Sequence, residues 1–360
     1  MPTTRGQVVS TSAQLVAALA QREARDILVA PGTYDWSTPF VDNAGHRLRA
    51  QTIGEAVFNA GLVIGGSSAA RGAVVEGITF DIREQSKTLQ GAAIHIWGSA
   101  TGVSIFDVSI SGHGVLASGV SARQPDGLII RRLTATGFSD YGVHVDASDP
   151  SRVLSTPALL EDIHVSEIAR PRARSSNGTA EACLWVGNTA VVRRVFVRSC
   201  AWTGVWTGTA NRGSTFEDID IDDTPVGLYL EHFTTGSVFD RLSIGPEVDV
   251  GVVCEWADPA WGGRPACVDA AIQNSTIDSC GIGVIMGPGT LRTTVRGVRF
   301  LNQRFAAVVY PDGLGNVLAD NDEVGIAGTA VPRLASITAR QLEESAACSR
   351  WSPGRLRRGS

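Results

Sequence analysis

The 360-residue sequence predicts an all-β fold in which short parallel strands wind into a solenoid. Three observations lead to this prediction. A six-residue pattern recurs along most of the chain, a second short strand accompanies each copy, and no helical pattern of ten or more residues lies between them. These observations exclude folds that alternate strands with helices. They also disfavour a β-sandwich, whose strands do not recur at a fixed period.

The six-residue pattern reads apolar, two mostly polar or small residues, apolar, any residue, apolar. Its alternation predicts β-strand. Successive copies begin 23 to 33 residues apart, so a basic unit of about 23 residues with loop insertions explains every gap. Two copies are imperfect, because Phe106 is apolar where a polar residue is expected and Ser275 replaces the central apolar residue. The nine copies are Val75–Phe80, Ile105–Ile110, Ile130–Ala135, Leu160–Val165, Val192–Val197, Phe216–Ile221, Phe239–Ile244, Ile272–Ile277 and Val295–Phe300.

One turn of such a solenoid cannot bury its own apolar face, so about ten to twelve stacked coils are expected to build the core. The open ends need caps. Residues 11–25 predict an N-terminal capping helix, since Thr11 to Gln14 match a capping box and an apolar stripe follows. The expected organisation is a cap and first coil over residues 1–35, a β-helix over 36–325, and a C-terminal cap and tail over 326–360.

The nine repeats, together with the segment Ile27–Tyr34 after the helix, resemble the right-handed parallel β-helix superfamily of pectin-lyase-like proteins. The resemblance covers about residues 11–325. It implies a right-handed parallel β-helix solenoid. It does not imply one activity, because this fold carries lyases, hydrolases, epimerases and proteins without catalysis. Motifs that identify a subfamily are missing.

Composition limits the partners. The formal net charge is −5 and there is no clustered basic surface, which argues against nucleic acid. No apolar stretch is long enough for a membrane span. No signal peptide is visible, so we expect a cytoplasmic protein if Met1 is the natural start and a secreted one if a precursor was trimmed. Nothing decides between a monomer and a homo-oligomer.

The six cysteines contain no CxxC motif, which argues against a zinc site. Cys254 and Cys267 flank one loop and are expected to pair only in a secreted protein. Free thiols are the expectation for a reducing cytosol.

Four of the second strands open with glycine at positions 142, 204, 227 and 251. Alternate residues after each glycine should point outward, and aligning the coils yields two outward columns. The first column is His95, Leu116, His144, Cys183, Trp206, Tyr229 and Val253. The second is Trp97, Ser118, Asp146, Trp185, Gly208, Glu231 and Glu255.

The columns mix aromatic rings with carboxylates, as a sugar-binding or cation-stabilising groove requires. We expect Gly208 to leave a gap for substrate. Insertions at 147–158, 169–180 and 256–268 are expected to wall the groove, unless they simply cover a packed surface. The predicted substrate-binding residues are His95, Trp97, Trp185, Trp206, Tyr229, His232, Trp256, Asp258, Trp261 and Arg264.

The predicted catalytic residues are Glu231, Glu255, Asp146 and His144. Glu231 and Glu255 occupy matching positions in adjacent coils, about 4.8 Å apart, so repulsion should raise the pKa of one of them. Such a spacing resembles a retaining glycosidase pair. His144 or His232 can serve as base or acid instead. No cofactor is predicted, and the acidic residues at 217–223 offer only a weak calcium site.

Three functions follow. The leading hypothesis is a carbohydrate-active lyase or glycosidase that uses carboxylate or histidine chemistry in this groove. The second is an intracellular cyclase or isomerase for a small apolar molecule, favoured by the aromatic face and the missing signal peptide. The third is a non-catalytic binding or structural solenoid, against which the three clustered insertions count.

Overall fold

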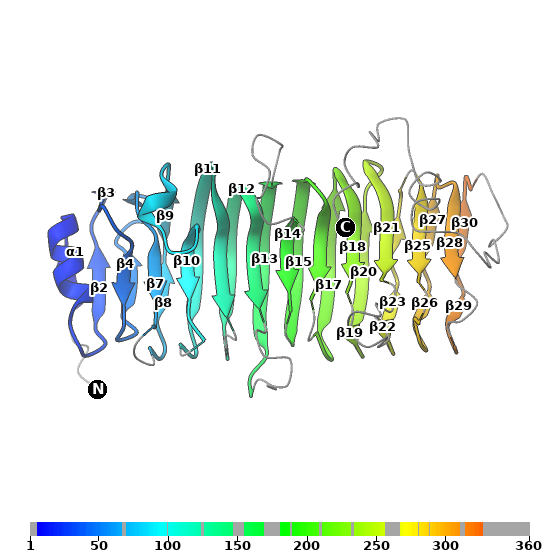
Figure 1. Ribbon diagram of the computed structural model, residues 1–360, viewed down its shortest axis with the longest axis horizontal. Helices are drawn as coiled ribbons and strands as arrows, with labels where there is room; N and C mark the ends of the chain where they lie inside the picture. Colours follow the sequence, from blue (N-terminus) through cyan, green and yellow to red (C-terminus); the bar gives the residue numbers. More distant parts are fainter. Residues whose placement is uncertain are drawn as a thin grey trace. The chain divides into compact units, whose positions relative to one another are not determined.

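The computed structural model describes residues 6–66, 70–98, 100–123, 126–146, 155–168, 181–187, 189–208, 211–231, 234–255, 267–279, 281–287, 289–309 and 314–326. The chain divides into two compact units, residues 1–169 and 170–360. Each is a stack of coils made of parallel strands (Figure 1). The predicted parallel β-helix is therefore confirmed. Within the described ranges no helix is long and apolar enough to cross a membrane.

Each coil of unit 1 contributes to three parallel ladders, which we name A, B and C. The long strands β11 and β12 run through all three ladders, and β13 runs through A and B. Ladder A begins with β1 (Gln7–Val9), β2 (Asp26–Val29), β5 (Arg47–Ala50) and β8 (Val74–Glu76); ladder B with β3 (Gly32–Tyr34), β6 (Ala56–Phe58) and β9 (Ile78–Asp81); ladder C with β4 (Phe40–Asp42), β7 (Leu62–Ile64) and β10 (Ala92–Ile96); then follow β11 (Ser104–Arg123), β12 (Ile129–Asp146) and β13 (Ala158–Ile168).

Unit 2 repeats this arrangement. Its first three A strands continue into ladder B without a break, while later coils split into separate strands. Ladders A and B contain β15 (Ala190–Cys200), β17 (Thr215–Asp222), β20 (Val238–Ile244), β23 (Ala271–Gln273), β24 (Thr276–Ile277), β26 (Thr294–Arg296), β27 (Arg299–Leu301), β29 (Val317–Ala319) and β30 (Asp322–Val324); ladder C contains β14 (Ala182–Val186), β16 (Thr203–Thr207), β18 (Thr224–Leu230), β21 (Val248–Cys254), β25 (Ile282–Met286) and β28 (Phe305–Val309); β19 (Thr234–Thr235) pairs with β22 (Cys267–Val268).

The predicted capping helix is α1 (Ser12–Leu19), which lies at the first coil of unit 1 (Figure 1). The Thr11 hydroxyl accepts a hydrogen bond from the Gln14 amide at 3.2 Å. The Gln14 side chain reaches back to the Ser10 amide at 2.8 Å, which completes a variant of the predicted capping box. The only other helix in the described ranges is the 3-10 turn η1 (Gln85–Lys87). The predicted C-terminal cap falls almost wholly on 327–360, outside the described residues.

A corner in the path of each coil explains the two polar or small positions of the repeat. The third residue of every copy has a left-handed backbone, with φ between 50° and 71°. The chain turns there from ladder A to ladder B, as at Gly77 between β8 and β9. Gly, Asn and Asp tolerate this conformation best, whereas other residues carry a cost. The corner residues are Gly77, Asp107, Arg132, Asp162, Arg194, Asp218, Arg241, Asn274 and Gly297.

Opposite charges follow one another at this corner within each unit. The Arg132 guanidinium donates to both carboxylate oxygens of Asp107, at 2.6 and 2.7 Å. Arg241 and Asp218 repeat the arrangement at 2.6 and 3.1 Å. Because these side chains are largely exposed, each pair stabilises the fold by less than about 1 kcal/mol. Their main effect is to favour the correct stacking of one coil on the next.

The interior of each unit is apolar. In unit 1 the Phe58 ring lies 5.4 Å from both Phe40 and Phe80, and in unit 2 Phe216 stacks on Phe239 at 4.7 Å. Ser275, the polar exception in the repeat, is buried but satisfied. Its hydroxyl accepts from the Leu242 amide at 3.0 Å and donates to the Gln273 carbonyl at 2.6 Å, which removes the desolvation penalty of an unpaired hydroxyl.

Glycine opens several of the ladder C strands, where the next coil approaches too closely for a side chain. A Cβ on Gly119, Gly204, Gly227 or Gly251 would lie 2.5 to 2.9 Å from the carbonyl oxygen of the matching glycine in the next coil. Real Cβ atoms do not come so close to backbone oxygens. At these four positions the glycine therefore allows the close approach of the next coil.

We expect Gly227→Ala to destabilise the protein by about 2–3 kcal/mol, because the backbone of the next coil cannot move away from the new methyl group. Urea unfolding should show a lower midpoint. The control is Gly213→Asn, at a φ of 60° with no atom within 4 Å of a Cβ, which should cost less than about 1 kcal/mol. Equal losses in the two variants would contradict this explanation.

Candidate functional site

The register of ladder C in unit 1 brings two histidines onto one face. His95 pairs with Ser121, and Ser121 pairs with His144. At the next outward position Arg123 pairs with Asp146. The predicted members Leu116 and Ser118 are therefore wrong. Both are buried, and Leu116 pairs with Phe138 instead.

The error arose from the corner of that coil. Its sequence offers Gly112, Gly114 and Gly119, and the predicted columns aligned Gly114 with Gly142. The structure aligns Gly119 with Gly142, since a Cβ on Gly119 would lie 2.5 Å from the Gly142 carbonyl oxygen. Because of this slip of five residues, the predicted columns also did not include Arg123.

The resulting group, which we call the histidine–arginine cluster, consists of His95, Trp97, Arg123, Tyr141, His144 and Asp146. The Trp97 ring meets the buried His95 ring edge-on at 4.9 Å, and the Arg123 guanidinium lies 5.7 Å from the Trp97 ring centre. Arg123 also donates to the Gln90 side-chain oxygen at 2.9 Å. These contacts orient a partly exposed cation beside an aromatic ring.

His144 lies flat against Tyr141, with ring centres 4.6 Å apart and an interplanar angle of 11°. Its side chain is partly exposed, unlike that of His95. The pair combines an imidazole with a phenol hydroxyl, two groups that can each carry a proton. Tyr141 was not predicted, because the sequence pattern placed it before the corner glycine and outside both columns.

Both histidines are neutral at pH 7. Burial, followed by the positive charge of Arg123, lowers the pKa of His95 and of His144 to about 4. Neither ring nitrogen of His95 has a hydrogen-bond partner in the described part of the chain. The cluster therefore joins a permanent cation to neutral imidazoles, each with one unprotonated nitrogen, a combination that attracts an anion and can accept a proton.

Two further histidines, His46 and His113, lie elsewhere in unit 1. His46 is buried, and its Nδ1 lies 2.8 Å from the Asp42 carboxylate. His113 contacts the Asp81 carboxylate in ladder B.

In unit 2 ladder C forms an aromatic cluster. Trp185 pairs with Trp206, and Trp206 pairs with Tyr229. Trp202, which the columns omitted, lies 5.0 Å from Trp206 and 4.8 Å from Tyr229. It follows a corner rather than an opening glycine, so the period of two did not include it.

Two predictions in this region are wrong. Cys183 is not an outward column residue, because it is buried and forms a disulfide with Cys200; the expectation of free thiols fails for this pair. Gly208 leaves no gap for a substrate, since a Cβ there would overlap the Trp185 ring. The prediction placed Trp185 in the second column beside Gly208, whereas the structure places it in the first column, paired with Trp206.

Glu231 and Glu255 directly follow Leu230 and Cys254, which pair in adjacent strands. They therefore occupy matching positions, as predicted. His232, Trp256, Asp258, Trp261 and Arg264 lie outside the described residues, as do almost all of the three insertions.

The remaining metal and thiol predictions have these outcomes. In the described ranges no group of three or more His, Cys, Asp or Glu side chains is placed to hold a metal. Asp218 pairs with Arg241 instead. Cys254 and Cys267 are buried free thiols. A hydrogen bond with Cys267, together with burial, raises the pKa of the Cys254 thiol.

Comparison with known proteins supports the fold. No family model and no curated protein matches the sequence. Among solved structures, the alginate lyase AlyF-OU02 in complex with G6 matches with a TM-score of 0.63 and 10% identity over 91% of this chain and 88% of that one. A PL6-family polysaccharide lyase from Pseudopedobacter saltans matches with a TM-score of 0.55 and 15% identity over 93% and 96%.

The catalytic domain of a GH87 alpha-1,3-glucanase in complex with tetrasaccharides matches with a TM-score of 0.59 and 11% identity over 88% of this chain and 70% of that one. These structures confirm the predicted resemblance to parallel β-helix proteins. At such identities the match establishes the fold alone. The activity has to be argued from the site.

We expect the cluster to make stability depend on pH. The pKa of His95 lies below its usual value of 6.5, so the unfolded chain binds more protons between pH 6.5 and 4. The contribution of one neutral imidazole to the free energy of unfolding is fully present above pH 6.5. It is lost as the pH falls to 4, a loss of about 3 kcal/mol. Urea unfolding across this range measures the slope.

His95→Phe keeps a ring against Trp97 and removes the titration, so its slope should be shallower than that of the wild type. His164→Gln, which changes an exposed imidazole, should keep the wild-type slope. An unchanged slope in His95→Phe would refute the assignment.

Proposed function

We propose that this chain is a polysaccharide lyase that cleaves a uronate-containing polysaccharide at the histidine–arginine cluster of unit 1. The observation that carries the proposal is the placement of Arg123 beside two neutral imidazoles and two aromatic rings on one outward face. The polysaccharide lyases with similar folds support it as an analogy.

Elimination from a uronate needs three groups, and the cluster supplies each. Arg123 binds the carboxylate and withdraws charge from the neighbouring ring carbon. His144, neutral and partly exposed, takes the proton from that carbon. The electron pair forms a carbon–carbon double bond as the bond to the leaving sugar oxygen breaks. Tyr141, stacked on His144, donates a proton to that oxygen.

The aromatic rings and the buried histidine position these groups. The edge-on contact of His95 with Trp97 fixes the indole on which a sugar ring can stack. His95 is fully buried and does not reach the substrate. It acts as a positioning residue. Asp146 is the register partner of Arg123 and adds a carboxylate to the same face.

A second candidate is a retaining glycoside hydrolase that uses Glu231 and Glu255 in unit 2. The matching positions of the two residues in adjacent coils favour it, since retaining enzymes need carboxyl groups about 5 Å apart. The aromatic cluster of Trp202, Trp206 and Tyr229 would supply the stacking surface. The solved structures named above offer no support for a small-molecule cyclase or isomerase.

The decisive test measures the ultraviolet absorbance of unsaturated uronides released from alginate and from polygalacturonate. We expect His144→Ala and Arg123→Gln to lower kcat by at least about 100-fold, because each removes one participant in the proton transfer. Glu231→Gln should retain activity close to that of the wild type.

His164→Gln serves as the matched control, since it alters an exposed histidine on another ladder. If the wild type forms new reducing ends without ultraviolet absorbance, and Glu231→Gln forms none, the glycosidase is the correct function and the lyase is not. Absorbance that survives His144→Ala would remove His144 as the base.

A further inference from the structure

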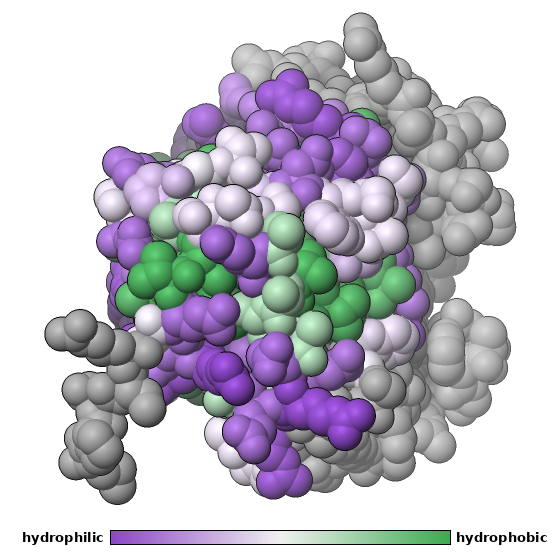
Figure 2. Space-filling model, turned by 90° about the vertical axis from the view of Figure 1, so that its left-hand side faces the viewer, coloured by the Kyte–Doolittle hydropathy of each residue, from purple (hydrophilic) through white to green (hydrophobic). Residues whose placement is uncertain are grey.

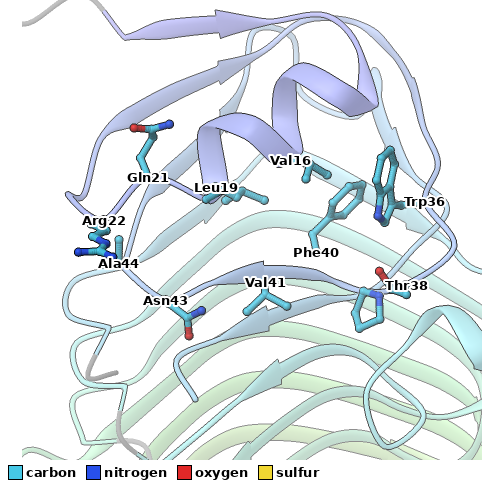
Figure 3. Close-up of a pocket in the computed structure, with 12 residues that line it drawn as sticks. Val16, Leu19, Gln21, Arg22, Trp36, Thr38, Phe40, Val41, Asn43 and Ala44 are labelled. Atoms are coloured by element: carbon cyan, nitrogen blue, oxygen red, sulfur yellow. The ribbon is translucent and has the colours of Figure 1, made fainter. Parts of the chain in front are cut away.

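A groove of about 810 Å³ lies between α1 and β4 in unit 1 (Figure 3). β4 is the first strand of ladder C, so only one of its edges pairs with another strand, β7. Helix α1 packs beside the other edge. The cap therefore leaves an open channel at the end of the ladder that carries the histidine–arginine cluster. None of the site residues named above lines it.

The lining combines apolar surface with hydrogen-bonding groups. Figure 3 shows Trp36 and Phe40 at one end and Arg22, Gln21 and Asn43 at the other. Trp36 and Val41 are exposed, by 39% and 43%, and Figure 2 shows an apolar strip bordered by hydrophilic residues on this end of the unit. Exposed tryptophan beside amides is suited to a sugar ring, which has an apolar face and polar edges.

Arg22 adds a positive charge to this groove. Its side chain is exposed, and it forms no ion pair with a described residue. An arginine held at the rim of a groove without a carboxylate partner can bind an incoming carboxylate with both of its parallel N–H groups. The charge of the groove thus matches the same anionic polymer as Arg123.

Gly66 lies between a residue of the groove and a residue of the cluster. A Cβ on Gly66 would lie 3.5 Å from the Asn43 side-chain oxygen and 3.6 Å from the Trp97 ring. Asn43 lines the groove and Trp97 belongs to the cluster, so the groove and the cluster have neighbouring residues on either side of this glycine. Strand β4 lies three strand spacings from β11, the strand that carries Arg123, which is a distance of about 14 Å.

We propose that this groove is a distal subsite for the same uronate chain, in which Arg22 binds a carboxylate several sugar units from the scissile bond and Trp36 stacks on a sugar ring. The identity of the ligand rests on the proposed function. The groove itself does not depend on where the chain is cut. Occupation of the subsite would make the enzyme prefer long substrates.

The test compares uronide trimers and hexamers, prepared from the polymer that the wild type cleaves. Arg22→Gln and Trp36→Ala should each raise KM for the hexamer about tenfold and leave kcat/KM for the trimer unchanged. Arg83→Gln, whose side chain is 70% exposed outside the groove, should behave as the wild type on both. Equal effects on the two lengths, or no effect on either, would overturn the proposal.

A binding measurement separates this proposal from the lyase. Titration of alginate and polygalacturonate hexamers into the intact protein, followed by calorimetry, needs no cleavage. If the wild type binds a hexamer but cuts none, and Arg22→Gln weakens binding about tenfold, the lyase fails and the subsite stands. Binding that is absent, or indifferent to Arg22→Gln and Trp36→Ala, would reject the subsite whatever the catalytic result.

Discussion

Stacking each coil directly on the next is the constraint from which the other features of both units follow. Parallel ladders place chemically equivalent residues about 4.8 Å apart, so every deviation from the coil's path is repeated or compensated in the neighbouring coil. The left-handed corner between ladders A and B is one consequence, since a polar or small residue must adopt it in each copy of the repeat. The glycines of ladder C are another, because carbonyl groups of adjacent coils leave no room for a Cβ.

The same constraint creates the chemistry of the outward face. Residues that are 26 and 23 positions apart in the sequence become neighbours in ladder C, which is how His95, Ser121 and His144 come into line. The small residue Ser121 stands between the two histidines in the register, and both imidazoles share the field of Arg123. A loop-built site would need separate interactions to hold these groups. Here the strand ladder holds them, and their low pKa values follow from burial on a rigid surface.

Periodicity made the fold predictable and left part of the site out of reach. The six-residue repeat and the capping residues Thr11 and Gln14 depend on local pattern, and both predictions were correct. The column positions depend on which glycine forms the corner. In the coil with Gly114 and Gly119 the local pattern permits both, and only contact with the next coil selects Gly119. An alignment of Gly119 with Gly142 would have revealed Arg123. The Trp185 ring lies against Gly208 because of side-chain packing, and no periodic pattern in the sequence predicts that packing.

An acidic protein with few cations on its predicted groove looks poorly suited to an anionic polymer, and the formal net charge is indeed −5. The local field decides the matter, because net charge acts over the whole surface and is screened within about 10 Å in physiological salt. Most arginines at the corners are neutralised by partners, as Arg132 is by Asp107 and Arg292 by Asp269. Arg123 instead rests on an aromatic ring and a neutral amide. Among the described residues Arg123 forms no ion pair, so under the proposed function its guanidinium is available to the carboxylate of one uronate unit beside the neutral imidazole of His144.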